Sequence, residues 1–302
     1  MDEETYTSQV SPELALLVVR ANELLARLEP WLPPVPPRVD WRATLACRWR
    51  RGPVRGWLQP LAQLNCPPWA ALKAIDEQKR QLDQNVRQFL AGLPCNHVLL
   101  TGSRGCGKSS LVKALLPRHH RKKLRLIEVD KDDLAHLPEL TDQLAGLPWR
   151  FIVFTDDLSF EAGDPAYKPL KAALDGSAAG LPANVLLAAT SNRRHLMPEY
   201  MAENLEASHQ GGQLHPGEST EEKVSLSDRF GLWLSFYPLD QDQYLDIATT
   251  WVAELGGRAD ADMRREALQW AIQRGGRSGR LARQFAAHWV GRQGLRRGKV
   301  KT

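Results

Sequence analysis

The chain has 302 residues, enough to bury a full hydrophobic core and to form two or three structural units. Hydrophobic residues make up 43% of it and charged residues 25%, which is ordinary for a globular protein. A formal charge of +5 permits contact with nucleic acid or another acidic surface but does not require it.

Cysteine usage and the start of the chain bear on the cellular compartment. The four cysteines form no C-x-x-C pair and have no histidine at zinc-finger spacing, so neither a metal site nor a disulfide framework is predicted. Residues 1–4 are acidic where a signal peptide would be basic, and no apolar run is long enough to cross a bilayer. We therefore expect reduced thiols, no membrane insertion and a cytoplasmic location.

The N-terminal region, residues 1–70, begins with a predicted helix. Ser11 and Pro12 have the form of an N-cap followed by proline at the first helical position, and leucines and valines then recur at helical spacing up to Leu28. A proline-rich stretch at residues 33–37 predicts an extended linker.

Residues 39–69 mix arginine with tryptophan. Aromatic rings between guanidinium groups can stack on bases and pair with phosphates, as in single-strand binders. The competing interpretation is a solvated basic face with the tryptophans packed beneath it, and we favour it because no nucleic-acid motif accompanies the stretch.

A glycine-rich segment follows a predicted helix at 75–90 and an apolar strand at 97–100, and it precedes a helical stretch at 111–116. It matches G-x-x-x-x-G-K-[ST], the P-loop, in which backbone N–H groups and a helix N-terminus hold a phosphate chain. Lys108 would reach the β- and γ-phosphates, Ser109 would bind Mg²⁺, and Ile75 could contact an adenine ring or belong to the core. The predicted phosphate-binding residues are Gly102, Ser103, Arg104, Gly105, Cys106, Gly107, Lys108, Ser109 and Ser110.

Strands alternate with helical stretches through the middle of the chain, which predicts a parallel sheet covered on both faces. After the strand at 97–100, the expected strands are residues 124–129, 151–155, 185–189 and 233–237, with a helix at 130–144. We place this α/β domain at residues 71–239.

Two neighbouring acids, Asp156 and Asp157, close the apolar strand at 151–155. Carboxylates at the end of a strand form a Walker B element when a P-loop lies upstream. We expect Asp156 to hold Mg²⁺ and Asp157 to take a proton from the attacking water or orient it.

The strand at 185–189 ends in Thr190, Ser191 and Asn192. These polar groups would lie beside the γ-phosphate if the strand lies between those that carry the P-loop and the Walker B pair. We choose Asn192 to orient water, with Thr190 and Ser191 as the alternatives.

Further along, residues 199–223 are polar and predict a surface insertion. The segment from 240 to 302 predicts three helices, at 244–255, 263–273 and 278–289, and a basic, frayed tail from residue 291.

Together, the Walker motifs, the polar strand end, a D-R-F element at residues 228–230 and the small helical C-terminal unit resemble the AAA+ ATPases. The strings FTDDLSFE, ATSNRRHLMPE and SLSDRFGLWLSFYPLDQDQY are similar to a bacterial AAA+ family, domain of unknown function 815. The resemblance covers residues 75–289. It implies strand order 5-1-4-3-2 in a five-stranded sheet and a helical lid formed by the C-terminal segment.

The resemblance also implies roles for single residues. Asn192 becomes the sensor-1 candidate, Arg229 the arginine finger that enters a neighbouring subunit's site, and Arg280 the sensor-2 candidate, with Arg277 and Arg283 as rivals. For Arg229 the alternative is a structural salt bridge. The second acid departs from the usual AAA+ glutamate because Asp157 is one methylene shorter, and Glu161 could compensate.

These observations predict an ATPase that requires Mg²⁺ and works as a ring-like homo-oligomer, remodelling a protein or nucleic-acid partner. The alternative is a slow switch or loader that binds ATP and hydrolyses it rarely. A nucleic-acid motor is a third hypothesis, based on the arginine and tryptophan stretch.

Overall fold

The computed structural model describes residues 12–28, 38–52, 55–160, 164–175, 180–192, 209–210, 213–214 and 226–298. The chain divides into two units, Met1–Arg38 and Val39–Thr302. The described element of the first unit is helix α1, Pro12–Leu28, whose bounds match the sequence prediction.

The second unit is built on a mainly parallel sheet. Its central strands are β3 (Val98–Gly102), β4 (Leu124–Glu128), β5 (Arg150–Thr155), β6 (Val185–Ser191) and β9 (Leu232–Phe236). They lie in the order β9-β3-β6-β5-β4, each parallel to its neighbour. This arrangement confirms the predicted order 5-1-4-3-2.

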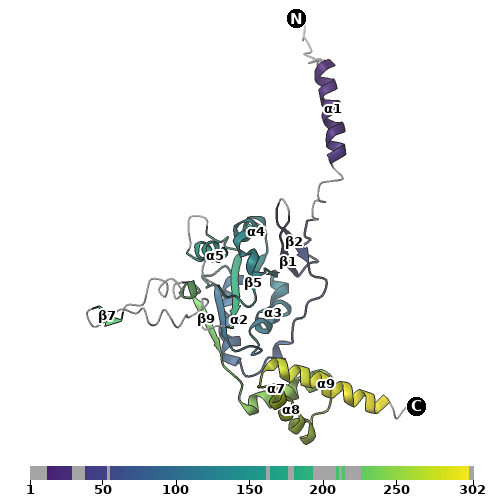
Figure 1. The fold of residues 1–302 in the computed structure, drawn as a ribbon, viewed down its shortest axis with the longest axis vertical. Helices are drawn as coiled ribbons and strands as arrows, with labels where there is room; N and C mark the ends of the chain where they lie inside the picture. The colour runs from purple at the N-terminus through teal and green to yellow at the C-terminus, as the bar shows by residue number, and fades with distance from the viewer. Residues whose placement is uncertain are drawn as a thin grey trace. The chain divides into compact units, whose positions relative to one another are not determined.

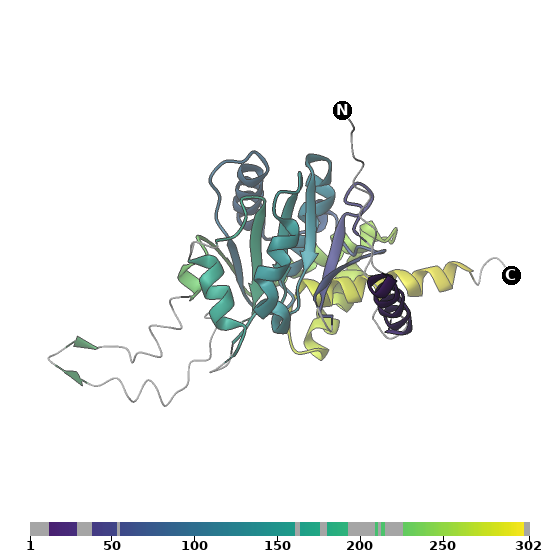
Figure 2. The ribbon, with the colours of Figure 1, turned by 90° about the horizontal axis from the view of Figure 1, so that it is seen from above.

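Two further strands, β1 (Ala46–Arg50) and β2 (Trp57–Pro60), extend the sheet from five strands to seven. β1 pairs in parallel with β4, and β2 pairs with β1 as an antiparallel edge strand. Figure 2 shows both of them, in purple, beyond the teal strands at one edge of the sheet. The expected count of five strands was therefore too low, and the sheet begins before the boundary expected at residue 70.

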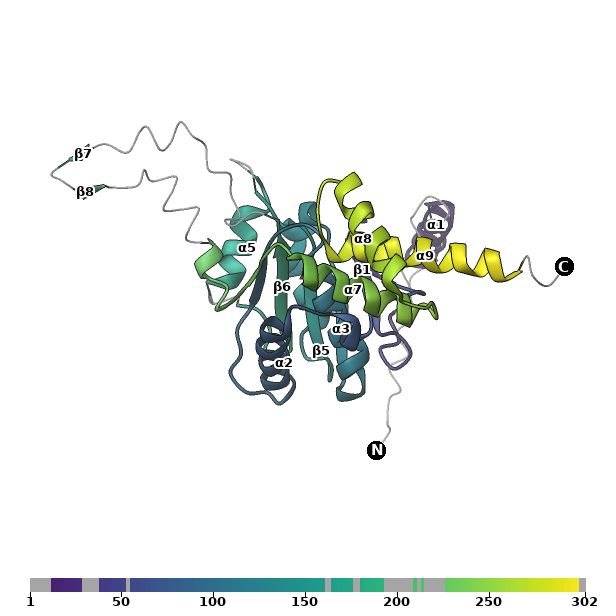
Figure 3. The same cartoon turned by 90° about the horizontal axis from the view of Figure 1, so that it is seen from below.

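Helices cover both faces of the sheet. Side chains alternate along each strand, so that Phe151 and Val153 of β5 face one core while Ile152 and Phe154 face the other. Helices α2 (Asp76–Leu90) and α3 (Lys108–His119) pack on the second of these faces, which is toward the viewer in Figure 3. Helices α4 (Leu137–Leu144) and α5 (Tyr167–Leu174) cover the other.

Local structure differs from the sequence prediction in two helices. α3 continues through Pro117 to His119, because the buried His119 ring lies 2.7 Å from Asp83 Oδ1 and holds the last turn against α2. The helix expected over 130–144 is instead a 3-10 helix, η4 (Lys131–His136), followed by α4. Two shorter 3-10 helices are η2 (Trp69–Ala71) and η3 (His120–Lys122).

The C-terminal helices α7 (Gln241–Glu254), α8 (Ala261–Gln273) and α9 (Gly279–Gly298) gather at one end of the sheet (Figure 1) and have a hydrophobic core of their own. Asp240 begins α7 with a capping box, and Asp260 caps α8 through the Met263 N–H. α9 extends nine residues past the expected end at 289, so the expected frayed tail is helical as far as Gly298.

The segment predicted as a surface insertion lies mostly outside the described residues. Its described parts are the two-residue strands β7 (His209–Gln210) and β8 (Gln213–Leu214), which pair with each other. Within the ranges that the structure describes, the helices are too short or too polar to span a bilayer.

Candidate nucleotide-binding site

The predicted P-loop connects β3 to α3, as the motif requires. Gly105 and Gly107 have φ angles of 76° and 100°, in the left-handed region that glycine adopts without strain. Gly105 also lies against the start of α9: a Cβ at this position would come within 3.0 Å of Ser278, and its carbonyl accepts a hydrogen bond from the Arg280 N–H at 3.3 Å. The loop is therefore held from one side by the C-terminal helices α7, α8 and α9, which we call the lid, through the start of α9.

Lys108 points into this site from the first turn of α3 and is 6% exposed. Its Nζ donates to the carbonyls of Gly102 and Ser103 at 2.7 and 2.8 Å, and to Asn192 Oδ1 at 2.9 Å. Burial lowers the pKa of the ammonium from its ordinary value, while the charges of Asp156 and Asp157 act in the opposite direction. Three hydrogen bonds thus hold the Lys108 ammonium beside the loop.

Asp156 lies beside the P-loop serine. Its Oδ1 accepts hydrogen bonds from Ser109 Oγ and from Thr190 Oγ1, each at 2.5 Å. A hydroxyl and a carboxylate together supply the hard oxygen ligands that Mg²⁺ prefers. The described residues contain no group of three or more His, Cys, Asp or Glu side chains that could hold a metal, and Mg²⁺ needs none, because it is bound through one or two protein oxygens, phosphates and water. Ser109 and Asp156 therefore fit the ion.

Asp157 and Lys108 are both hydrogen-bonded to Asn192. The Asn192 amide donates to Asp157 Oδ1 at 2.5 Å, while its carbonyl oxygen accepts from Lys108. The structure thus brings the predicted lysine, the second acid and the predicted water-orienting residue into one network. Asp157 itself has a φ of 55°, in the left-handed region where Asp and Asn are more common than most side chains.

The structure distinguishes the three residues at the end of β6 that were considered for orienting water. Thr190 and Asn192 line the cavity, whereas Ser191 is fully buried and is not among its lining residues. Glu161, the residue expected to compensate for the shorter acid, lies outside the described residues.

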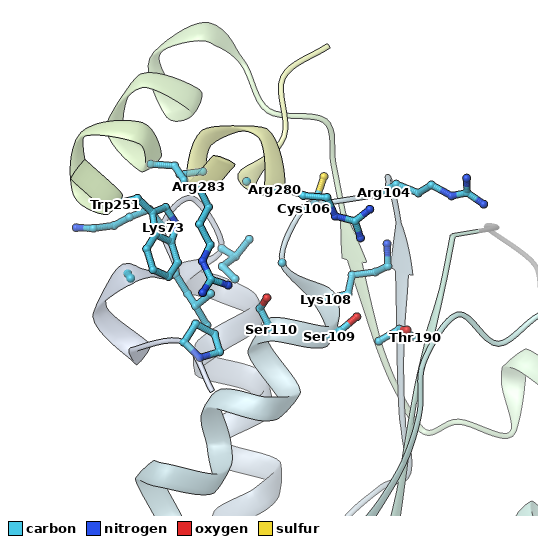
Figure 4. A pocket seen from close by; sticks show the side chains of 18 of the residues that line it. Lys73, Arg104, Cys106, Lys108, Ser109, Ser110, Thr190, Trp251, Arg280 and Arg283 are labelled. Atoms are coloured by element: carbon cyan, nitrogen blue, oxygen red, sulfur yellow. The ribbon is translucent and has the colours of Figure 1, made fainter. Parts of the chain in front are cut away.

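A cavity of about 870 Å³ contains these groups and extends from the P-loop to the lid. In Figure 4, Lys108, Ser109 and Thr190 lie at one end, and Lys73 and Trp251 at the other. The sequence prediction missed this second end, which the segment before α2 and the lid supply. Its residues are Asn65, Pro67, Ala71, Leu72, Lys73, Ile247, Trp251, Gln284 and Ala287.

Ile75 combines the two possibilities that the sequence left open. It lines the cavity, and it is 5% exposed and belongs to the core between α2, α3 and the sheet. Its Cδ1 lies 3.6 Å from the position of a Cβ on Gly107. Ile75 is therefore a core residue at the wall of the cavity, beside the P-loop.

Among the three arginines considered for sensor 2, Arg280 and Arg283 line the cavity and Arg277 does not. In Figure 4 the Arg280 side chain extends toward Lys108, whereas Arg283 extends toward Ser110. The Arg283 guanidinium also lies 4.9 Å from the centre of the Trp251 ring. Arg104, although part of the P-loop, points away from the other labelled side chains.

Arg229 does not line this cavity. It lies just before β9 and forms an ion pair through Nε with Asp175, at the C-terminal end of α5. The flanking residues Leu226 and Phe230 are buried in the core. Within one chain, Arg229 therefore lies apart from the cavity that contains the predicted P-loop residues.

The arginine and tryptophan stretch contributes two tryptophans to the core, while its arginines are half-buried or exposed. Trp49 is fully buried in β1 and Trp41 is 8% exposed, with its ring 4.8 Å from that of Phe151. Arg48 is paired with Glu128 at 2.8 Å. These two tryptophans are not available to stack on bases, in agreement with the interpretation that packs them beneath a basic face.

Several solved structures have a similar fold. The Thermotoga maritima RuvB Holliday junction branch migration motor matches with a TM-score of 0.50 and 16% identity over 74% of this chain and 65% of its own. The FIGL-1 AAA domain in complex with ADP gives 0.49 and 17% over 74% and 73%. Aeropyrum pernix Orc1 in complex with DNA gives 0.46 and 18% over 69% and 57%. This chain thus spans about two thirds of the RuvB chain.

No curated protein matches the chain. A family model described as protein of unknown function (DUF815) matches residues 42–293, which include the whole sheet, the P-loop and almost all of the lid. The chain therefore belongs to the DUF815 family and has the fold of the AAA+ P-loop NTPases.

Proposed function

We propose that this protein binds ATP with Mg²⁺ and hydrolyses it. The observation that carries the proposal is the network in which Asn192 joins Lys108 to Asp157 inside the cavity. The Asn192 amide bonds to the Lys108 ammonium on one side and to the Asp157 carboxylate on the other. The ammonium can bind phosphate oxygens, and the carboxylate can accept a hydrogen bond from water. The C-terminal helices supply part of the far wall of the cavity, through Ile247, Trp251 and Gln284.

We assign each residue of the site a role in the proposed hydrolysis. The P-loop N–H groups and Lys108 hold the phosphates, and Ser109 and Asp156 supply oxygen ligands for Mg²⁺. An ion held by these two residues would supply positive charge that offsets the charge of the phosphates. Asp157 orients the attacking water and accepts its proton, and Asn192 fixes the position of the Asp157 carboxylate. Arg280 contacts the phosphates from the lid.

We propose further that the active form is a ring-like homo-oligomer in which Arg229 acts on the nucleotide of the neighbouring subunit. This proposal is supported by the place of Arg229, which pairs with Asp175 at α5 and does not line the cavity of its own chain. Hydrolysis in such an assembly would drive changes in a bound protein or nucleic acid.

The experiment is to measure ATP turnover per subunit as a function of protein concentration, for the wild type and for Arg229→Ala. We expect specific activity to rise with concentration and to fall about a thousandfold or more in the variant, the range for a missing arginine finger. The partly exposed Arg229–Asp175 pair is worth less than about 1 kcal/mol, so unfolding should change little. A flat specific activity that Arg229→Ala does not alter would remove the oligomeric mechanism.

The second candidate function is a switch that holds a partner while ATP is bound and hydrolyses slowly. Two features of Asp157 favour it: the carboxylate is one methylene shorter than glutamate, and its backbone is left-handed, with φ 55°. Both limit where the carboxylate can reach. A pull-down with Asp157→Asn, which should stay in the ATP-bound state, tests for a partner held in this way.

A further inference from the structure

The Thr190 hydroxyl bonds to both acids that follow β5. Thr190 is 1% exposed at the end of β6. Its Oγ1 donates to Asp156 Oδ1 at 2.5 Å and accepts from the Asp157 N–H at 2.9 Å. One buried hydroxyl therefore uses its single hydrogen on the first acid and a lone pair on the second.

The backbone strengthens this attachment. β5 and β6 are parallel, with Thr155 beside Ala189, so the turn after β5 lies next to Thr190. The Leu158 N–H donates to the Thr190 carbonyl at 2.6 Å. Thr190 thus holds three consecutive residues, Asp156, Asp157 and Leu158, through three hydrogen bonds.

The middle residue of these three is the strained one. A φ of 55° is unfavourable for a side chain with a Cβ, although aspartate tolerates it better than most. Such a conformation persists only where surrounding bonds impose it. The bond from the Asp157 N–H to Thr190 is such a constraint, and it leaves the Asp157 carboxylate directed at Asn192.

We infer that Thr190 is a positioning residue, whose hydroxyl fixes the ligand oxygen of Asp156 and the backbone of Asp157 at once. Although Thr190 lines the cavity, its hydroxyl bonds to the two acids, so we assign it an effect on the nucleotide and Mg²⁺ through them. The inference rests on the proposed function, because it assigns Thr190 to the same site. Two residues at the end of β6 then have separate roles: Thr190 positions both acids, and Asn192, which follows the strand, connects Asp157 to Lys108.

The substitutions follow from the chemistry of the hydroxyl. Thr190→Val keeps the shape of the side chain but can neither donate nor accept, whereas Thr190→Ser keeps both bonds. Loss of a group that orients a metal ligand typically weakens metal affinity or activity about ten- to hundredfold. Thr141→Val is the matched control, because Thr141 is also buried and donates its hydroxyl to the Pro138 carbonyl, in α4.

The first measurement needs no nucleotide: hydrogen exchange at the Asp157 amide of the full chain. We expect faster exchange in Thr190→Val, and wild-type exchange in Thr190→Ser and Thr141→Val. Unchanged exchange in Thr190→Val would overturn the inference. If Thr190→Val does not fold, Thr190→Ala removes the same hydroxyl without placing a new methyl group there.

The second measurement is titration of a fluorescent ATP analogue in EDTA and in Mg²⁺. We expect Thr190→Val to bind the analogue as the wild type does in EDTA, to lose about tenfold or more of the Mg²⁺-dependent gain in affinity, and to turn over more slowly. Equal Mg²⁺-dependent gains in both proteins would overturn the inference. A wild type that binds no ATP analogue would instead contradict the proposed function, and the exchange measurement would still decide the role of Thr190.

Discussion

Asn192 donates a hydrogen bond to Asp157 Oδ1 at 2.5 Å. The carbonyl oxygen of the same amide accepts a hydrogen bond from Lys108 Nζ. The Asn192 side chain therefore links the Lys108 ammonium directly to the Asp157 carboxylate. Under the proposed function, ATP has to enter this network, because the Lys108 ammonium already donates its three hydrogen bonds to Gly102, Ser103 and Asn192. Phosphate oxygens would replace some of these acceptors.

Lys108→Ala should reduce ATP affinity at least about a hundredfold, since hydrogen bonds to charged groups contribute the most to binding. Equilibrium titration with a fluorescent ATP analogue measures this. Lys113→Ala is the matched control: it removes a lysine from the same helix that pairs with Glu128 and does not line the cavity. Full affinity in Lys108→Ala would remove the P-loop assignment.

Asp157→Glu should lower kcat and leave ATP affinity unchanged. The left-handed backbone costs most side chains about 1–2 kcal/mol and suits aspartate better than glutamate. The added methylene also moves the carboxylate away from Asn192. Steady-state kinetics with saturating Mg²⁺ and ATP measure both quantities. A rise in kcat would favour the slow switch over an ATPase built around aspartate.

Glu128 predicts a pH dependence of stability. Burial acts to raise its pKa, but the hydrogen bonds and charges of Arg48 and Lys113 outweigh burial and hold the pKa below the ordinary value of 4.5. A carboxyl whose pKa is lowered by folding contributes stability that is present above pH 4.5 and is lost as the pH falls below it. The two ion pairs of Glu128 connect β4 to β1 and to α3, because Arg48 lies on β1 and Lys113 on α3.

Glu128→Gln tests this dependence. We expect it to reduce the free energy of unfolding at pH 7 by about 1–2 kcal/mol, a value discounted because Arg48 is 37% exposed. The difference from the wild type should shrink as the pH is lowered through the range below 4.5, where the carboxyl becomes neutral. Urea unfolding from pH 3 to pH 7 measures this, and a difference independent of pH would contradict it.

Periodicity and motif spacing predicted the central part of the fold because they report local chemistry. The apolar runs at β3, β4, β5 and β6 are buried strands with little ambiguity, and the carboxyl ends of parallel strands meet at one edge of the sheet. The predicted Lys108, Asp156 and Asn192 consequently lie together. The same logic could not place Arg229 against Asp175, because that contact depends on how α5 and β9 pack.

The strands β1 and β2 were missed although their pattern is present in the sequence. Cys47 and Trp49 are buried while Arg48 and Arg50 are half-buried, an alternation with the period of a strand. Because of its arginines, the stretch was interpreted as a basic surface and not as a strand. Its burial depends on the pairing of β1 with β4, which is distant in sequence, and on the ion pair between Arg48 and Glu128.

The lid end of the cavity was missed for a similar reason. Trp251 and Ile247 have the spacing of an ordinary amphipathic helix, and the pattern predicts core residues. That they also line the cavity follows from the docking of α9 on Gly105, which no local pattern encodes. Residues that reach a site only through tertiary packing can be identified only from the structure.

Mixing two inactive variants tests the central claim, that a site is completed by Arg229 of a neighbouring subunit. Arg229→Ala keeps Lys108 and Asp157 but lacks the finger, and Asp157→Asn keeps the finger but lacks the acid. Each variant alone should be inactive. An equimolar mixture should recover about a quarter of the wild-type turnover, because one in four random interfaces joins an intact site to an intact finger. A mixture as inactive as its components, under conditions where the two variants co-assemble, would contradict the account.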